Sequence, residues 1–473
     1  MGVTAPPMRI MNFIFQSIRE SIFPQGLTTP EAIGSYISFA VMIIFAAIYT
    51  YQFVYIFISF VRRPLKYPKT DQTKRYAVMI AARNEELVLP ELLKSIKGQT
   101  YPTDLIDIYV IADNCTDQTA EVARSFGATV YERHNKEQVG KGYALQYLLN
   151  FIKEAKGLRY YDAYMVFDAD NVLRTNYIEE MDKAYCAGNR ILTSYRNSKN
   201  YGNSWVSAGY ALWFMHEARH LNNVRAMLKT SGAISGTGFL IDSAIVERND
   251  GWKYFLLTED IEFSSDAVLH GERVGYCHEA ELFDEQPETF RQSWRQRSRW
   301  AKGFFQVYRH YGKGLLKGTA KMHWACFDMC MTIMPAFLLT AFELLSVTAT
   351  LIINRVIHGF WSPTLLGCYV EFLAFGYCLL LVIGLLTLIP EWRKIHCPKW
   401  KAILHLFTFP IFMMSYIPIS VCALFSHVEW KPIEHKHAMA TSDIEKAGKG
   451  AKQAQKEAAD SENQEEQSVN TTN

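Results

Sequence analysis

The hydrophobic positions of the chain gather in two regions that lie on either side of a polar one. Gly34 to Phe60 carries no charge over more than the roughly 20 residues that an α-helix needs to cross a bilayer. Three more apolar stretches follow late in the chain, at 325–353, 363–389 and 402–425. Nothing comparable occurs between Ile80 and Trp300. The pattern therefore predicts a polar domain framed by membrane segments.

Inside the polar region, short apolar runs of strand length alternate with stretches of helical spacing. The runs lie at 76–82, 106–111, 129–131 and 163–167, and apolar residues three or four positions apart follow the first three. Strands that alternate with helices predict a mostly parallel sheet covered on both faces. The expected fold class is α/β, a Rossmann-like domain inserted between transmembrane helices.

Polar side chains follow three of these runs. They are Asn84-Glu85, Asp113 and the D-x-D pair of Asp168 and Asp170. Ligands of parallel sheets bind beyond the carboxyl ends of the strands, so we expect these residues to converge on one site. One or two carboxylates commonly hold Mg²⁺ or Mn²⁺ against substrate phosphates. For a D-x-D pair taken alone, a loop of solvated acids is the alternative.

The flanking segments predict a membrane topology. Six Lys and Arg residues lie between Arg62 and Arg75 with only one acid among them, which indicates that the polar domain is cytoplasmic. Three spans after this domain would leave the C-terminus outside. The last apolar stretch contains Pro410 and Pro418, however, so a broken or re-entrant segment is the alternative.

These observations divide the chain into six regions. We expect an amphipathic interface segment over 1–33, a transmembrane helix over 34–60, the cytoplasmic domain over 61–290, interfacial helices over 291–323, three hydrophobic membrane segments over 324–427, and a Trp-containing segment with a disordered polar tail over 428–473. Asp328, Glu343 and Glu371 fall in the late apolar stretches. Because charge is costly there, we expect them to line a polysaccharide channel, to lie near the membrane interface or to be packed as neutral acids.

The overall charge excludes one class of function. Lys and Arg number 49 against 47 Asp and Glu, a formal net charge of +2. A nucleic-acid-binding protein would have a strongly basic domain, so no nucleic-acid partner is expected. Hydrophobic residues make up 49% of the chain, which also argues against a wholly disordered protein.

The polar motifs taken in order are much more specific than any one of them. Asp113, Asp168-Ala169-Asp170, Thr258-Glu259-Asp260 and Gln296 to Trp300 follow one another at 76–305. They resemble the D, DxD, TED and QxxRW motifs of family 2 glycosyltransferases, above all the processive membrane synthases of cellulose, hyaluronan, chitin and poly-N-acetylglucosamine. Because few residues follow the last apolar stretch, we do not expect regulation through the C-terminal cyclic-dinucleotide domain of cellulose synthases. The resemblance implies a GT-A-type domain that uses Mg²⁺ or Mn²⁺.

The resemblance also implies a role for each matching residue. Nucleotide binding would fall to Ala82, Glu85, Asp113, Lys141, Asp168, Arg297 and Arg299, and metal binding to Asp170. Asp260 would be the general base, with Glu259 beside it raising the Asp260 pKa by like-charge proximity. Acceptor binding would fall to Gln296, Trp300, Gly236 and Gly238. Trp430 to His435 resembles a short Trp-containing segment that returns to the catalytic domain in related synthases.

The function expected from this resemblance is processive, inverting synthesis of a β-linked polysaccharide in the plasma (inner) membrane. The partners would be a UDP-sugar, the growing polysaccharide and the bilayer, and UDP-glucose is the first choice of donor. A poly-N-acetylglucosamine or hyaluronan-like product is an alternative. So is a non-processive, lipid-linked glycosyltransferase. An alternative from a different functional class is a transporter whose polar domain only binds nucleotides.

Overall fold

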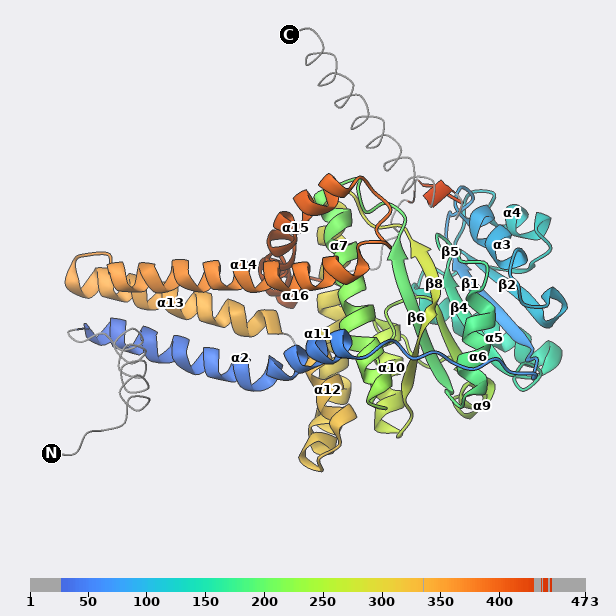
Figure 1. Cartoon of the computed structure of the whole chain (residues 1–473), viewed down its shortest axis with the longest axis horizontal. Helices are drawn as coiled ribbons and strands as arrows, with labels where there is room; N and C mark the ends of the chain where they lie inside the picture. The colour runs from blue at the N-terminus through green and yellow to red at the C-terminus, as the bar shows by residue number, and fades with distance from the viewer. Residues whose placement is uncertain (1–26, 335, 429–434, 436, 441–442, 445–473) are drawn as a thin grey trace, which may run out of the picture.

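The computed structural model describes residues 27–334, 336–428, 435, 437–440 and 443–444. Residues 1–26 of the expected interface segment, Trp430 and the part of the polar tail after Ile444 lie outside these residues. Figure 1 shows an α/β domain from which three long helices extend side by side. The fold class expected from the sequence is confirmed.

One eight-stranded sheet forms the centre of the domain, in the order β3-β2-β1-β4-β7-β6-β8-β5. β3, β2, β1 and β4 are parallel, and β6 is parallel to β8, whereas β7 and β5 pair antiparallel to their neighbours. The strands are β1 (Tyr76–Ala82), β2 (Ile106–Asp113), β3 (Thr129–Arg133), β4 (Ala163–Asp168), β5 (Val172–Leu173), β6 (Ile191–Ser198), β7 (Phe239–Asp242) and β8 (Val274–Asp284).

Helices cover both faces of this sheet because alternate strand residues point to opposite sides. Tyr76, Val78 and Ile80 of β1 enter one core, which is closed by α3 (Leu89–Lys97), α4 (Thr119–Ser125) and α6 (Tyr177–Cys186). Ala77 and Met79 enter the other, which is closed by α5 (Lys141–Lys156), α9 (Ser243–Arg248) and α10 (Glu259–Leu269). The two buried cores hold the parallel strand ends in register.

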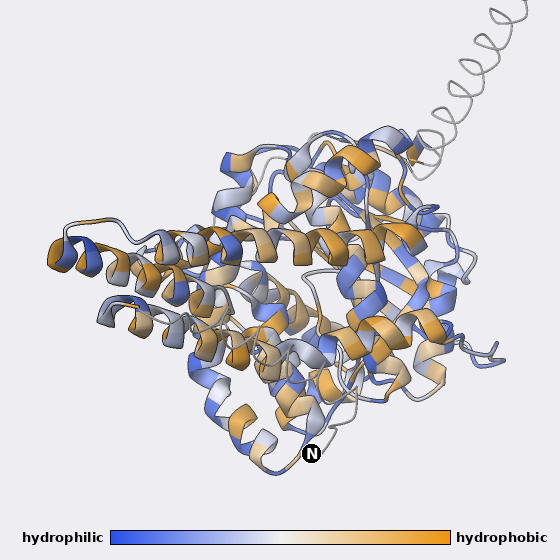
Figure 2. Ribbon diagram, turned by 60° about the vertical axis from the view of Figure 1, so that its left-hand side comes forward, coloured by the Kyte–Doolittle hydropathy of each residue, from blue (hydrophilic) through white to orange (hydrophobic). Residues whose placement is uncertain are grey.

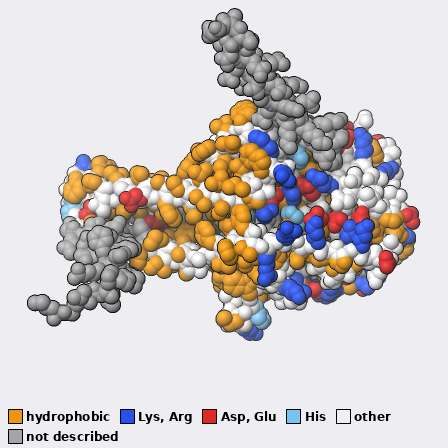
Figure 3. Space-filling model, viewed as in Figure 1, with side chains coloured by type: hydrophobic (Ala, Val, Ile, Leu, Met, Phe, Trp, Pro, Cys, Tyr) orange, Lys and Arg blue, Asp and Glu red, His pale blue; other side chains and the backbone are white. Residues whose placement is uncertain are grey.

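Within the described residues, three single helices are both long and apolar enough to cross a bilayer. They are α2 (Thr29–Val61), α13 (Ala336–His358) and α14 (Pro363–Glu391). The 33 residues of α2 span about 50 Å, more than the roughly 30 Å of hydrocarbon. Hydrophobic side chains gather over these helices, while charged ones gather over the sheet domain (Figure 3). The ribbon coloured by hydropathy shows long helices with many hydrophobic residues (Figure 2). The long helices are held together by polar pairs, Ser38 with Glu343 and Glu31 with Ser362.

The apolar stretch expected at 325–353 divides into two helices. α12 (Trp324–Ile333) ends just before Pro335, and α13 begins after it. A proline inside a helix would remove a backbone hydrogen bond and clash with the preceding turn, which accounts for a break here. α12 is too short to span a bilayer. Of the stretch expected at 325–353, only the part in α13 is therefore long enough to cross.

The last apolar stretch also divides in two. α15 (Lys399–Met414) packs on α7 (Trp205–His216), and α16 (Tyr416–Phe425) packs on α13 and on α11 (Phe290–Ala320). Phe409 and Phe412 of α15 are buried against Ala208 and Leu212 of α7. With Ser415 between them, the two helices make a stretch of 27 residues, long enough to cross if they acted as one. Their packing instead ties them to the sheet domain.

Candidate active site

A cavity of about 1200 Å³ runs from the carboxyl ends of the parallel strands to the long apolar helices. The register aligns Ala81 of β1 with Asp168 of β4, and Ala82 with Ala112 of β2, so the strand-end motifs meet at one edge. Of the residues proposed from the sequence, the cavity is lined by Ala82, Glu85, Asp113, Lys141, Asp168, Asp170, Gly236, Glu259, Asp260, Gln296, Arg299 and Trp300. The far end is lined by residues such as Gln52 of α2 and Ser420 of α16.

Asp113 is held by a partner that the motifs do not include. Arg133 at the end of β3 donates to its Oδ1 at 2.7 Å, and both side chains are buried. The second guanidinium nitrogen of Arg133 donates to the backbone oxygen of Gln138 at 2.7 Å. Arg133 therefore fixes the orientation of Asp113. The other carboxylate oxygen of Asp113 is left to accept a hydrogen bond at the strand end of the cavity.

Lys141 lies between the D-x-D pair and the Gly236 loop. Its Nζ donates to Asp168 Oδ1 at 2.5 Å and to the backbone oxygen of Gly236 at 2.8 Å. It is the first residue of α5, where the helix N-terminus adds partial positive charge. Lysine and helix end together favour an anion at this point.

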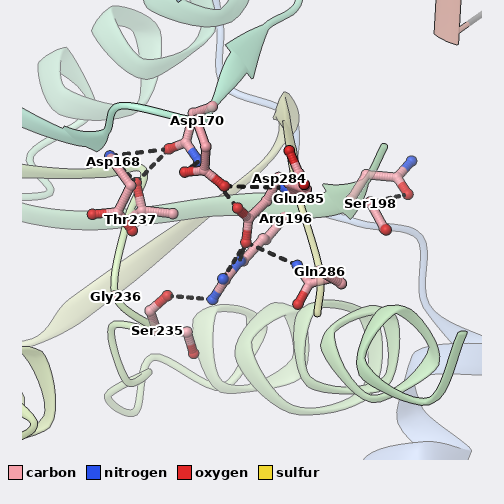
Figure 4. Close-up of polar contacts among 12 residues, drawn as sticks. Asp168, Asp170, Arg196, Ser198, Ser235, Gly236, Thr237, Asp284, Glu285 and Gln286 are labelled. Carbon is pink, nitrogen blue, oxygen red and sulfur yellow. Dashed lines mark hydrogen bonds and ion pairs between the residues drawn. The ribbon is translucent and has the colours of Figure 1, made fainter. Parts of the chain in front are cut away.

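Asp170 lies deeper, beside a buried ion pair from the far half of the sheet (Figure 4). Arg196 Nε donates to Asp284 Oδ2 at 2.6 Å, and the Glu285 backbone N–H donates to Asp170 Oδ2 at 3.2 Å. Burial raises the pKa of the Asp284 carboxyl, although Arg196 opposes this shift. The segment at the end of β8 therefore holds the D-x-D loop in place through the contact of Glu285 with Asp170.

Asp260 and Glu259 begin α10 and face the cavity. Burial raises the pKa of Asp260, while the backbone N–H of Ile261 and the Lys141 ammonium oppose the rise. Burial likewise raises the pKa of Glu259, and the adjacent Asp260 charge adds to it. Two neighbouring carboxylates with raised pKa values in one cleft are typical of acid–base catalysis.

The Gln296 to Trp300 segment lies on the first turns of α11. Arg299 donates to the backbone oxygen of Leu257 at 2.9 Å, which brings its charge close to Glu259 and Asp260. The Trp300 ring meets Tyr210 edge-on, with centroids 5.7 Å apart. Gln296 Oε1 is buried and has no hydrogen-bond partner among the described residues.

Two residues proposed from the sequence lie elsewhere. Arg297 is fully buried outside the cavity, and its Nη1 donates to Phe412 O and Ser415 Oγ, each at 2.8 Å. It fastens α11 to the junction of α15 and α16, away from the residues that line the cavity. Gly238 is likewise absent from the cavity wall. A Cβ there would lie 2.1 Å from Leu282 Cδ2, so close packing requires this glycine.

Several cavity residues have no counterpart in the motifs. Arg196 reaches the cavity from β6, and Glu217 reaches it from the π-helical turn η2 (Glu217–Asn222), which precedes α8 (Asn223–Met227). Glu217 accepts from Ser235 Oγ at 2.7 Å, and burial raises its pKa. A π-helical turn often marks a functional site but has no recognisable sequence pattern.

The residues present fit a divalent cation that is bound together with phosphates. Among the described residues, no group of three or more His, Cys, Asp or Glu side chains is arranged as a complete metal cage. Mg²⁺ and similar ions at phosphate sites typically use only one or two carboxylates and take other ligands from the substrate. Asp170, with Asp168 and Lys141 beside it, matches that pattern of donors.

Comparisons with known proteins agree with this geometry. Residues 74–303 match the family model described as "Glycosyltransferase like family 2". YdaM of Bacillus subtilis, a probable glycosyltransferase, is 27% identical over 252 residues, 48% of this chain and 55% of that protein. A beta-monoglucosyldiacylglycerol synthase of Nostoc is 25% identical over 292 residues, 59% of each chain. A poly-beta-1,6-N-acetyl-D-glucosamine synthase of Staphylococcus epidermidis is 25% identical over 244 residues, 50% of this chain and 56% of that protein.

The fold has a solved counterpart. The mannosyltransferase PcManGT from Pyrobaculum calidifontis, in complex with GDP-Man and Mn²⁺, superposes with a TM-score of 0.52 at 16% identity, covering 82% of this chain and 98% of that one. The chain spans somewhat more than half the length of the curated relatives that it matches. Residues 74–303 are thus similar to the glycosyltransferases of family 2.

Proposed function

We propose that the protein is an inverting hexosyltransferase that takes a UDP-sugar at the strand ends and transfers the sugar to an acceptor presented by the membrane helices. The observation that carries this proposal is the continuity of the cavity. One space of about 1200 Å³ connects Asp113 and Lys141 to Asp260, and then to residues of α2 and α16. A transporter whose polar domain only binds a nucleotide would not need a raised-pKa carboxylate pair at the midpoint of this space.

The donor end suits a uridine diphosphate. Asp113, oriented by Arg133, has an acceptor oxygen for the N–H of the uracil ring, and Ala82 and Glu85 line the same pocket. Lys141 and Arg299 supply positive charge where a diphosphate would follow. Asp170 would hold Mg²⁺ or Mn²⁺, which when bound neutralises the negative charge that develops on the departing diphosphate.

Asp260 is the proposed general base. As the acceptor oxygen forms its bond to the anomeric carbon, its proton passes to the Asp260 carboxylate, and the bond from that carbon to the diphosphate oxygen breaks. A single displacement inverts the anomeric centre, so an α-linked UDP-sugar gives a β-linked product. The Gly236 and Ile261 backbone N–H groups hold the Asp260 carboxylate in place.

Trp300 and Gln296 are the proposed acceptor platform. An indole face stacks well on the apolar face of a pyranose ring. The buried Oε1 of Gln296 is an unused acceptor, and leaving such a group unpaired is costly, so a sugar hydroxyl at this position would satisfy it. Gly236 has φ +81 and leaves the space before Asp260 open.

For the acceptor, our first candidate is the growing chain of a β-linked polysaccharide, made processively and passed along the membrane helices. The QxxRW segment and the extension of the cavity to α2 and α16 support it. UDP-glucose giving a cellulose-like or mixed-linkage β-glucan is the first choice. The similarity to a poly-beta-1,6-N-acetyl-D-glucosamine synthase supports an N-acetylglucosamine polymer as the next choice.

A membrane lipid is the second candidate acceptor. It is favoured by the similarity to a beta-monoglucosyldiacylglycerol synthase and by the small number of long helices. His435, which follows α16 in the chain, lies against Asp170 on the catalytic domain. If α2, α13 and α14 cross the membrane, α15 and α16 must then return to the same side. Three crossing helices enclose little space for a polymer but leave a path for a lipid hydroxyl.

The test uses the purified full-length chain in vesicles with and without diacylglycerol, each UDP-sugar separately, and Mg²⁺ or Mn²⁺. A high-molecular-mass product that linkage-specific β-hydrolases degrade supports the polymer, whereas a single sugar on the lipid supports the glycolipid. Asp260→Asn protein provides the blank. UDP-sugar turnover equal to that blank with every donor would contradict transferase activity altogether.

A further inference from the structure

One carboxyl group in the cavity has no part in the chemistry proposed above. Glu217 lines the cavity at the start of η2, and its Oε1 accepts from Ser235 Oγ at 2.7 Å. Among the described residues, Glu217 Oε2 has no hydrogen-bond partner. A carboxyl group can accept more hydrogen bonds than this one contact uses. Glu217 is therefore able to bind a hydroxyl group of a ligand in the cavity.

Ser235 holds Glu217 beside the proposed general base. Ser235 precedes Gly236, and a Cβ on that glycine would lie 4.0 Å from Asp260 Oδ2. Arg196 Nη1 donates to the Ser235 backbone oxygen at 2.8 Å, which keeps this loop in place (Figure 4). Burial raises the pKa of Glu217, and the nearby Asp260 charge adds to the rise. Glu217 and Asp260 therefore face the same part of the cavity.

Aromatic rings lie next to the Glu217 carboxyl. Trp213 and Phe214 precede Glu217 by four and three positions, so the three side chains share one helix face. All three line the cavity, and the ring centroids of Phe214 and Trp300 are 6.2 Å apart. An aromatic face packs on the apolar face of a pyranose ring, while a carboxyl group accepts hydrogen bonds from its hydroxyls. This combination suits a sugar ring.

The two arginines whose charges act on Glu217 are already paired. Arg196 Nε donates to Asp284 Oδ2 at 2.6 Å, and Arg225 Nη2 donates to Asp328 Oδ1 at 2.6 Å. An acceptor phosphate would bring a charge that these guanidinium groups already neutralise elsewhere, and burying an uncompensated charge is costly. This part of the cavity therefore favours a neutral acceptor.

We propose that Glu217 binds the acceptor by accepting a hydrogen bond from a second hydroxyl, next to the hydroxyl that Asp260 deprotonates. This inference rests on the proposed function and narrows its acceptor. The acceptor is a sugar with neighbouring hydroxyls, at the end of a glycan or on the head group of a glycolipid. Diacylglycerol, which has a single hydroxyl, and a lipid phosphate both lack the second hydroxyl that Glu217 binds.

The test combines a change in the protein with a change in the acceptor. Purified full-length protein is assayed with UDP-glucose and UDP-N-acetylglucosamine separately, and with dodecyl β-glucoside or dodecyl β-N-acetylglucosaminide as acceptor. Monodeoxy analogues of the better glycoside follow. Besides the analogue without the reacting hydroxyl, which is inert, one analogue should lower the wild-type kcat/KM at least about tenfold, as for a lost hydrogen bond to a charged group.

Glu217→Ala should give a similar loss with the unmodified glycoside and no further loss with that analogue, because the two changes remove the same hydrogen bond. The KM for the donor should stay within about twofold of the wild type. Glu217→Gln keeps an oxygen for Ser235 and should show a smaller loss of the same kind, which guards against misfolding of the alanine variant. Glu247→Ala, at an exposed glutamate of α9, is the matched control and should leave kcat/KM unchanged.

Three results would count against the assignment, and they can be distinguished. If Glu217→Ala were as sensitive to the deoxy analogue as the wild type, Glu217 would not bind the acceptor. If neither glycoside accepted the sugar, the inferred acceptor would be wrong, although transfer to diacylglycerol or undecaprenyl phosphate would keep the proposed transferase. If no UDP were released with either donor and any of these acceptors, the proposed function itself would be wrong.

Discussion

Arg225 and Asp328 form a buried ion pair with two parallel contacts, Nε to Oδ2 at 2.9 Å and Nη2 to Oδ1 at 2.6 Å. Arg225 is on α8 of the catalytic domain, and Asp328 is on α12. Tyr51 and Tyr55 of α2 donate to the same carboxylate at 3.0 and 2.9 Å. The sequence suggested a channel-lining or neutral acid at position 328. The structure instead makes it the point where the first membrane helix, the catalytic domain and α12 are joined.

Removing one member of this pair should destabilise the protein. We expect Asp328→Ala to lower the free energy of unfolding by about 3–5 kcal/mol, because the Arg225 charge would stay buried without a partner. Arg225→Met combined with Asp328→Leu should recover most of the loss, since apolar residues often replace a buried pair at little cost. Equilibrium denaturation in detergent measures both. If Asp328→Ala lowered the free energy of unfolding by less than 1 kcal/mol, the ion pair would not be what holds these helices together.

Asp260→Asn should separate chemistry from binding. The amide keeps the size of the side chain but cannot take the acceptor proton, so transfer should fall at least about 100-fold, within the range that general bases contribute. UDP affinity, measured by calorimetry, should stay within about threefold. Glu262→Gln is the control, because this acid lies on the same helix but bonds to Leu256 N away from the cavity. If the Asp260→Asn protein retained transfer, Asp260 would not be the general base.

The pH dependence of transfer should follow Asp260 and not Glu259. Asp260 must be ionised to act as base, so the rate should rise with pH through the Asp260 pKa, which burial places above its usual range. Burial and the Asp260 charge raise the pKa of Glu259 to about 7, so Glu259 is still protonated while Asp260 ionises. Glu259→Gln should therefore leave the rising limb in place, as measured by kcat against pH at saturating donor. A limb that moves to lower pH would show that Glu259 is charged when Asp260 loses its proton.

The strand-end part of the site could be predicted because its geometry follows from local pattern. Alternating strands and helices imply parallel strands, and parallel register brings their carboxyl ends together. Asp113, Asp168 and Asp170 are therefore found from the sequence without knowledge of tertiary contacts. The helix break before α13 was not predicted, because a proline such as Pro335 does not by itself decide between a break and a continuous helix: Pro390 and Pro410 lie inside α14 and α15.

The remaining site residues depend on contacts that no local pattern contains. Glu217 reaches the cavity because η2 adopts π-helical geometry within a run that reads as ordinary helix. His435 reaches Asp170 from 265 positions away in sequence (435 − 170). Arg297 and Arg299 are two residues apart, so they point about 200° apart around α11. Which of them faces the cavity is decided by how α11 packs, and the sequence alone does not give that rotation.

Substituting these two arginines should give different defects. Arg299→Met should raise the KM for the UDP-sugar and lower kcat, because its charge lies at the cavity. Arg297→Met should lower the unfolding temperature, because it loses two hydrogen bonds to Phe412 and Ser415, while its folded fraction should keep a nearly wild-type donor KM. Kinetics on the monodisperse fraction distinguish the two. If both substitutions raised the KM for the UDP-sugar equally, Arg297 would have to be assigned to the donor site.

Gly236 and Gly238 should likewise differ, although both have positive φ. Alanine at Gly238 would combine backbone strain at φ +64 with a Cβ only 2.1 Å from Leu282 Cδ2 and 2.7 Å from Ser194 Oγ. We expect a cost of about 3 kcal/mol, the sum of left-handed strain and overpacking in a closed core. Equilibrium denaturation of the Gly238→Ala protein measures it.

Gly236→Ala should cost only the strain of about 1–2 kcal/mol, because no heavy atom lies closer than 3.9 Å to its Cβ. That Cβ would point towards Asp260 Oδ2, 4.0 Å away, and so would narrow the space where the acceptor hydroxyl must enter. Transfer to acceptor should therefore fall while UDP binding is kept. If Gly236→Ala were the more destabilising change and Gly238→Ala the one that impairs transfer, the acceptor side of the site would have to be placed at Gly238 instead.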